Sequence, residues 1–147
     1  MMKNWCEKRE CGKDTGLCSE YMAINETLNN FEALGVIGAI IKIENHVAAF
    51  TIGEALNNNT AVVHFEKAMP EFIGLYQVIN QMFCQNHLAQ FEFINREQDL
   101  GIEGLKKAKE SYFPDHLVEK YIVYQNPEVL QMLKSTKILH ECENIER

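Results

Sequence analysis

The stretch that decides the fold covers residues 60–87 and reads TAVVHFEKAMPEFIGLYQVINQMFCQNH. Its first part, residues 60–67, is a short run rich in β-branched and apolar residues, which predicts a strand. After Pro70, apolar residues recur at steps of three and four over residues 71–87, which predicts a long helix with one core-facing side.

The residues on either side complete an α+β pattern. Residues 91–95 (FEFIN) predict a second strand, parallel to the first because a helix separates the two. Residues 36–43 and 47–54 are apolar runs joined by a short turn-forming link, which predicts an antiparallel hairpin. The predicted fold is therefore a central mixed sheet flanked by helices.

The remaining elements follow from the same periodicities and from capping residues. They are a helix over residues 19–30 with Ser19 as its N-cap, a helix over 102–112 that ends before Pro114, a strand over 120–125 and a short helix over 128–134. Because 147 residues is a common size for one domain, we expect a single domain over 1–147, with an N-terminal extension at 1–18 and a C-terminal tail at 135–147.

The composition is that of a globular, cytoplasmic protein. Hydrophobic residues make up 46% of the chain and charged residues 24%, a mixture that excludes intrinsic disorder. The longest uncharged apolar stretch, residues 34–41, falls short of the roughly 20 apolar residues of a membrane-spanning helix, so no transmembrane segment is expected. The charged N-terminus lacks the apolar core of a secretory signal.

The five cysteines favour free thiols, because their number is odd and no export signal is present. Cys6, Cys11 and Cys18 are separated by four and then six residues, without the C-x-x-C pair that is typical of a zinc site. We therefore expect no metal.

The net charge of −7 repels phosphate backbones and anionic membranes, which argues against DNA as a partner. Any nucleic-acid contact must be local. Lysines gather at positions 106, 107, 109 and 120, either as a phosphate-binding patch or as a solvated helix face interleaved with Glu103 and Glu110.

The order of the elements locates a candidate site. In sheets with a crossover helix, ligands bind at the carboxyl ends of the parallel strands, where the helix N-terminus points its free amides. This places the site at residues 66–74. The same order resembles the core of the GCN5-related N-acetyltransferase (GNAT) superfamily, which implies that an acyl donor lies between two splayed strands.

Local motifs resemble a more specific family. In order along the chain they are AFTIGEAL (49–56), VVHFEKA (62–68), YQVINQMF (76–83) and INREQDLGIEGLKKAKESYFP (94–114). Together they are similar to a largely uncharacterised bacterial family grouped with the C-terminal domain of phosphatidylglycerol lysyltransferases. Named members transfer lysine from lysyl-tRNA to a lipid, and family members usually carry a second acyltransferase-like half. The resemblance therefore implies a cleft completed by a homodimer or by a separate N-terminal half.

Three residues are candidates for the chemistry. Glu66, near the end of its predicted strand, is where the superfamily often holds the base; the alternative is a salt bridge with Lys67 or Arg96. His64 should share the sheet face of Glu66 by strand alternation and either orient substrate, act as a base or serve a structural role. Tyr112 lies near the end of the second predicted helix, where the superfamily that the order resembles commonly uses a tyrosine to protonate the leaving group; the alternative is packing beneath Pro114.

Other residues are candidates for binding the donor. Arg96 directly follows a buried strand and offers a planar fork for a carboxylate or phosphate. Phosphate contacts are also expected from the amides around Ile73 and Gly74 and from three lysines, Lys67, Lys106 and Lys109.

The sequence thus predicts an acyl or aminoacyl transferase that uses acyl-CoA or an aminoacyl-tRNA, bound by its 3′ end, and a small-molecule or lipid acceptor. A catalytically inert domain that retains the cleft for ligand binding or interaction is the alternative. A nucleic-acid-binding module ranks third.

Overall fold

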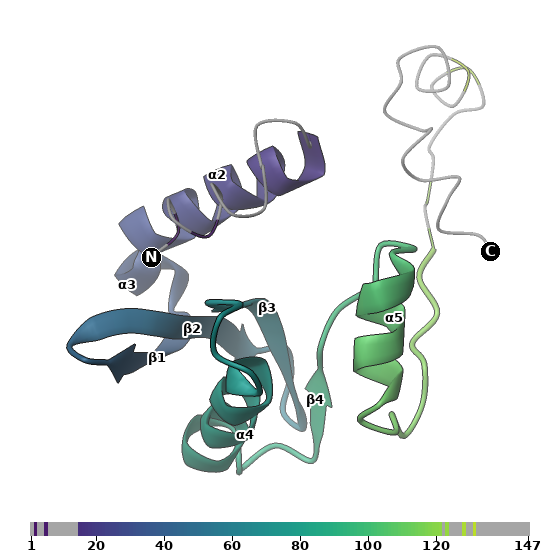
Figure 1. The fold of residues 1–147 in the computed structure, drawn as a ribbon. Coiled ribbons are helices and arrows are strands. Elements are labelled where there is room, and N and C mark those ends of the chain that lie inside the picture. The colour runs from purple at the N-terminus through teal and green to yellow at the C-terminus, as the bar shows by residue number, and fades with distance from the viewer. Residues whose placement is uncertain are drawn as a thin grey trace. The chain divides into compact units, whose positions relative to one another are not determined.

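The computed structural model describes residues 2, 5, 15–121, 123, 128 and 131 of the chain. The chain separates into two compact units, Met1–Glu97 and Gln98–Arg147. The first contains α2 (Thr15–Asn29), α3 (Phe31–Leu34), β1 (Ile37–Ile43), β2 (His46–Ala55), β3 (Thr60–Ala68), α4 (Leu75–His87) and β4 (Phe93–Asn95); the second contains α5 (Glu103–Glu110) (Figure 1).

The four strands form one mixed sheet in the order β1-β2-β3-β4. β1 pairs with β2 and β2 with β3 in antiparallel fashion, whereas β3 and β4 are parallel and joined through α4. This arrangement confirms the predicted mixed sheet, its hairpin and its crossover. The hairpin turn uses Glu44 and Asn45 at φ values of 48° and 64°, the backbone geometry of a tight turn between twisted strands.

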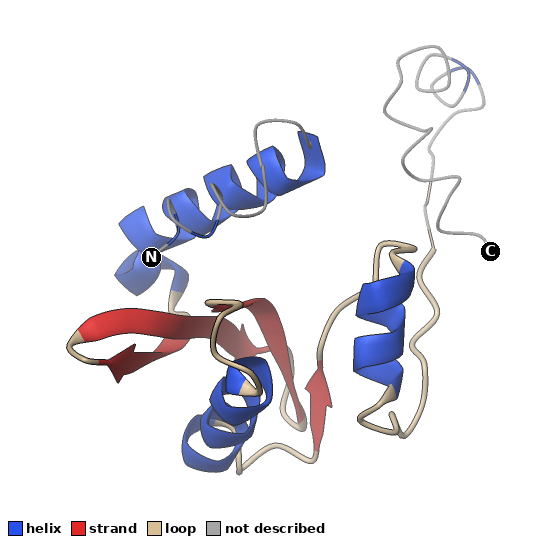
Figure 2. Ribbon diagram, in the orientation of Figure 1, coloured by secondary structure: helices blue, strands red, loops and turns tan. Residues whose placement is uncertain are grey.

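The two longest helices of the first unit cover opposite faces of the sheet (Figure 2). On the α2 face, Ile24 packs with Phe50 and Ile52. On the α4 face, Ile79 packs with Ala49 of β2 and with other alanine and aliphatic side chains of β1 and β3. Because both faces are covered, the middle of β2 is buried at successive positions instead of alternating.

Two helix starts differ from the sequence prediction. α2 begins at Thr15, so Ser19 lies inside the helix and is not its N-cap. α4 begins at Leu75, not at residue 71, because Gly74 has a left-handed φ of 81° and the preceding residues form turns. The Leu75 N–H donates to the carbonyl oxygen of Phe72 within these turns.

A β-bulge in β3 changes the faces of its side chains. Gly53 pairs with Val63 and Ile52 pairs with Phe65, so His64 is an extra residue whose backbone is opposite no residue of β2 in the register. Val63 consequently packs under α4, while Phe65 packs on the α2 face. Strict alternation fails at this point, and with it the predicted shared face of His64 and Glu66.

In the second unit, α5 begins and ends within the helix predicted over 102–112. Lys120, Tyr121 and Val123 are in no strand, contrary to the prediction for residues 120–125. The rest of that segment, most of the helix predicted over 128–134, the tail at 135–147 and Cys6 and Cys11 in the N-terminal extension lie outside the described residues. Within the described part of the chain, no helix has the length and apolar character needed to cross a membrane. The single-domain organisation stays a prediction.

Candidate functional site

The candidate site lies beside β3, beyond the point where β4 ends. The two strands are paired only from Thr60 and Phe93 to Val62 and Asn95. β4 ends there, whereas β3 continues to Ala68. The second half of β3 is therefore not paired with β4, and the residues that follow β4 reach its side chains.

Two side chains bind the Glu66 carboxylate, one from the segment after β4 and one from α4. Its Oε1 accepts a hydrogen bond from Arg96 Nη2 at 3.0 Å, and its Oε2 accepts one from Asn80 Nδ2 of α4 at 2.8 Å. The Glu66 and Arg96 side chains are only 11% and 24% exposed, and Asn80 is buried. The ion pair is thus partly shielded from water, which strengthens it relative to a surface pair.

Glu66, Arg96 and Asn80 form a polar cluster, the Glu66 cluster, on the α4 face of the sheet. Two further groups are close to it. Thr51 lies opposite Glu66 in the β2–β3 register, and its buried hydroxyl makes no hydrogen bond within the described residues. Burial raises the pKa of the Cys84 thiol above its usual 9.0, while Arg96 lowers it and Glu66 raises it. The Glu66 cluster is therefore a compact polar group inside the sheet–helix layer, and Cys84 is its unreactive neighbour.

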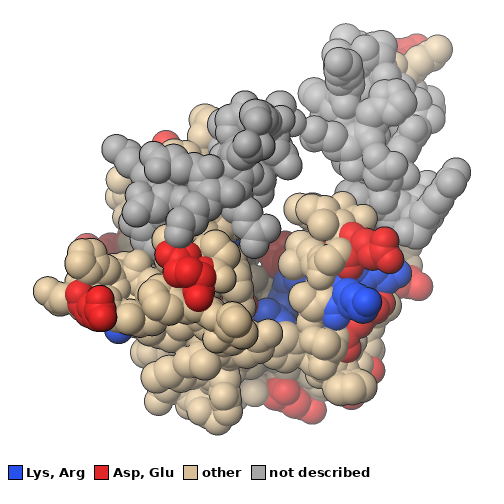
Figure 3. All heavy atoms as spheres, in the orientation of Figure 1, with Lys and Arg blue, Asp and Glu red and all other residues tan. Residues whose placement is uncertain are grey.

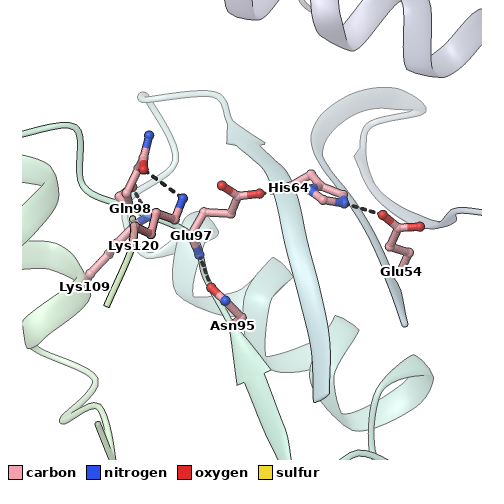
Figure 4. Close-up of polar contacts among 7 residues, drawn as sticks. All are labelled: Glu54, His64, Asn95, Glu97, Gln98, Lys109 and Lys120. Carbon is pink, nitrogen blue, oxygen red and sulfur yellow. Dashed lines mark hydrogen bonds and ion pairs between the residues drawn. The ribbon is translucent and has the colours of Figure 1, made fainter. Parts of the chain in front are cut away.

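His64 lies on the other face, between two carboxylates (Figure 4). Its Nε2 is 2.8 Å from Glu54 Oε1 on β2, and its Nδ1 is 2.9 Å from Glu97 Oε1, just after β4. Glu97 has a left-handed φ of 60°, and its N–H donates to Asn95 Oδ1 at 2.8 Å. His64 also lines a surface cavity of about 220 Å³ with Thr27 and Leu34, on the α2 side of the sheet.

The hydrogen bonds of His64 define its charge. A carboxylate only accepts, so both ring nitrogens must carry a proton to donate to Glu54 and Glu97. Burial lowers the pKa of His64, but the hydrogen bonds to Glu54 and Glu97 and the attraction of both carboxylates outweigh it and raise the pKa above 6.5. A base role for His64 would first require one of these bonds to break.

The candidate donor-binding residues of the first unit do not gather at one place. Lys67 is buried on the α2 face, where its Nζ lies 2.6 Å from Glu20 Oε1 and 4.7 Å from the ring centre of Trp5. Ile73 is fully exposed in the turn before α4, and Gly74 follows it directly. Lys67 therefore has a structural partner, while the turn at residues 73–74 is open to solvent.

Three of the predicted site residues, Lys106, Lys109 and Tyr112, belong to the second unit. Lys109 Nζ donates to the carbonyl oxygen of Gln98 at 2.6 Å, and Lys120 Nζ donates to the Gln98 side chain at 2.8 Å (Figure 4). Lys106 lies 3.9 Å from Glu110 on the exposed side of α5. Tyr112, just after the helix, is 41% exposed.

Sequence reasoning missed two partners in this region, Asn80 and Glu54. Asn80 is a polar residue at a core-facing position of α4, and this mismatch in an amphipathic pattern is the signal that marks a buried polar partner. Glu54 carries no comparable signal, because its contact with His64 depends on the bulge in β3.

Comparisons with known proteins place the chain in a family and find a related structure. Residues 1–124 match the family described as phosphatidylglycerol lysyltransferase, C-terminal, which confirms the resemblance seen in the motifs. A crystal structure of a conserved protein of unknown function from Bacteroides thetaiotaomicron is 42% identical and superposes with a TM-score of 0.76. The match covers 79% of this chain but only 39% of that protein. No curated protein matches the chain.

Proposed function

This chain belongs to the phosphatidylglycerol lysyltransferase C-terminal family, and on that premise we propose that it is a cytoplasmic transferase of acyl or aminoacyl groups. The donor is an aminoacyl-tRNA or an acyl-CoA, and the acceptor carries an amine or hydroxyl. The family description names lysyl transfer and phosphatidylglycerol, so we propose phosphatidylglycerol as acceptor and lysyl-tRNA as the first donor to test. We also propose that a second copy of the chain or a separate N-terminal half completes the cleft. The match covers 39% of the Bacteroides relative.

The observation that carries the proposal is the second half of β3, which has no strand partner on the β4 side after the Val62–Asn95 pair. GNAT-like transferases hold the acyl donor between two splayed parallel strands, and we propose the same fold and donor position here. The donor lies along the unpaired half of β3. The exposed turn at Ile73 and Gly74, at the N-terminus of α4, supplies amides for a phosphate of the donor.

The proposed reaction is a direct transfer. The nitrogen or oxygen of the acceptor forms a bond to the acyl carbonyl carbon, and the bond to the tRNA 3′ oxygen or CoA sulfur breaks. Glu66 takes the proton of the acceptor, and Tyr112 gives a proton to the leaving group. Arg96, beside Glu66, offers its guanidinium to the developing negative charge on the carbonyl oxygen.

Glu66 keeps the capacity to accept a proton. An ionised carboxylate has about four lone-pair positions, and the bonds from Arg96 and Asn80 use one on each oxygen. The lone pair that remains on each oxygen leaves room for an acceptor proton.

The test is transfer of radiolabelled lysine from lysyl-tRNA to phosphatidylglycerol vesicles, followed as label in the lipid extract. Glu66→Gln keeps the size of the side chain but removes the base, and we expect a loss of about 100-fold or more in rate. Glu32→Gln, on the exposed side of α3, is the matched control and should leave the rate unchanged. Unchanged turnover in Glu66→Gln would exclude the base role.

One observation favours a catalytically inert binding domain as the second candidate. Both oxygens of Glu66 and both ring nitrogens of His64 are already engaged within the protein. A thermal-shift titration with acetyl-CoA, CoA and an aminoacyl-tRNA 3′-end analogue separates the two candidates, because a ligand that binds only the folded state raises Tm. A shift without measurable transfer to any acceptor supports the binding domain.

A further inference from the structure

The segment that follows α5 leaves large apolar side chains uncovered. No residue from 98 to 121 is buried. Phe113 is 90% exposed and Leu117 84%, followed by Val118 at 65% and Tyr121 at 77%. Scattered exposed apolar residues are ordinary, but a run of this kind within nine positions marks a surface for a partner or a membrane.

The backbone holds this segment in an unfavourable conformation. Phe113 has a left-handed φ of 53°, which is rare for a bulky residue and costs about 1 kcal/mol or more. Its N–H donates to the carbonyl oxygen of Glu110 at 2.9 Å, and Tyr112 donates in the same way to Lys109. The end of α5 thus fixes the turn, and no burial of the Phe113 ring compensates the strain.

The local charge differs from that of the whole chain. Residues 103–121 contain four lysines and four acidic residues, a net charge of zero, whereas the whole chain carries −7. On the face shown in Figure 3, blue and red spheres lie side by side in the region of α5. Lys106 and Lys107 are both exposed on this helix. The net charge of this segment is therefore less unfavourable to an anionic surface than the net charge of the chain as a whole.

We propose that residues 113–121 dock on the surface of an anionic lipid bilayer, with Phe113 and Leu117 inserted between headgroups and the α5 lysines above them. The inference rests on the proposed function, because the family description names phosphatidylglycerol, an anionic membrane lipid, as acceptor. Exposed aromatic and aliphatic side chains beside lysines are typical of proteins that bind at the membrane interface. Residues 113–121 are in no helix or strand and none of them is buried.

The test is flotation of the whole chain with vesicles of phosphatidylcholine alone or mixed with phosphatidylglycerol, without any donor. We expect binding to the mixed vesicles and about tenfold weaker partitioning for Phe113→Ser/Leu117→Ser. The control is Val78→Ser/Met82→Ser, which removes two exposed apolar side chains from α4 and should bind like the parent. Circular dichroism checks that both variants fold.

Other outcomes would overturn the proposal. Equal vesicle binding by the parent and by Phe113→Ser/Leu117→Ser excludes this segment, and absence of binding by the parent excludes docking. If the parent is a dimer that Phe113→Ser/Leu117→Ser dissolves, and vesicles do not float it, the surface is a protein interface instead. Transfer to detergent-dispersed phosphatidylglycerol keeps the two proposals apart, because it needs the chemistry but no bilayer docking.

Discussion

The imidazole of His64 can donate from both of its nitrogens only when it is doubly protonated. This condition links three segments of the chain, because Glu54 lies near the end of β2, His64 forms the bulge of β3 and Glu97 lies just after β4. Loss of the proton leaves one carboxylate without its donor. At the residue scale, the protonation of His64 therefore controls how firmly the start of the Glu97 segment is held.

Stability should depend on pH through His64. Its pKa is raised in the folded state, so its contribution is complete below the unfolded value of 6.5 and is lost as the pH rises through the higher folded value. Urea unfolding at pH 6 and pH 8 should show lower stability at pH 8, by roughly 1 kcal/mol or less because solvent screens the ring. His64→Gln should remove most of this difference; an unchanged pH dependence would contradict the assignment.

Arg96 should matter more for stability than an exposed lysine. Arg96→Met leaves the Glu66 carboxylate shielded with only Asn80 as donor, and we expect a loss of about 2 kcal/mol in unfolding free energy. Glu66→Gln/Arg96→Met should cost less, because no unpaired charge remains. Lys106→Met breaks a pair at 3.9 Å on exposed side chains and should change stability by less than about 0.5 kcal/mol.

At the scale of elements, the contact between β2 and β3 depends on a residue without a side chain. A Cβ on Gly53 would lie 2.4 Å from the carbonyl oxygen of Val62 and 3.3 Å from the ring of Phe83. Gly53 therefore lets β2 pass close to β3 next to the bulge while Phe83 of α4 packs over it. The bulge, the close approach and the placement of His64 form one structural unit.

Gly53→Ala should consequently destabilise the fold by about 3 kcal/mol, because backbone must shift to relieve the overlap. Gly104→Ala is the matched control: a Cβ at position 104, in α5, meets nothing within 4 Å, and alanine favours helix. Thermal unfolding followed by circular dichroism compares the two. Equal Tm values for both variants would show that the sheet accommodates the added methyl group.

At the scale of the whole molecule, the two units differ in how much they bury. The first has cores on both faces of its sheet, whereas the described residues of the second bury no side chain. Hydrophobic burial is the main source of stability in a folded domain. The described residues of the second unit are held together by hydrogen bonds such as those at Gln98.

Hydrogen exchange should reveal this difference. Amides of α4 near Ile79 and Phe83 should exchange on the order of 100-fold more slowly than those of α5, because opening α4 exposes core residues. Mass spectrometry of the chain in buffer measures both segments at once. Equal protection of α4 and α5 would contradict the assignment, and slower exchange at 103–121 with phosphatidylglycerol vesicles would agree with docking.

The sequence by itself determined the order of the elements from residue 36 to residue 95 and the family. The hydrophobic periods of residues 36–54 and 60–95 predict the hairpin and the crossover, because burial acts on neighbouring positions that share a face. The run from Asn95 to Tyr112 carried the resemblance to the family that matches residues 1–124. These features depend on residues that are close together in the sequence, so they can be predicted without the tertiary structure.

Only the tertiary structure decided which side chains meet. Glu66 finds Arg96 and Asn80, at separations of 30 and 14 residues, because α4 and the end of β4 return to β3. His64 leaves the face of Glu66 because of the bulge, which no alternation pattern predicts. Hydrogen bonds and ion pairs depend on ångström distances between residues far apart in the chain, and those distances are set by packing.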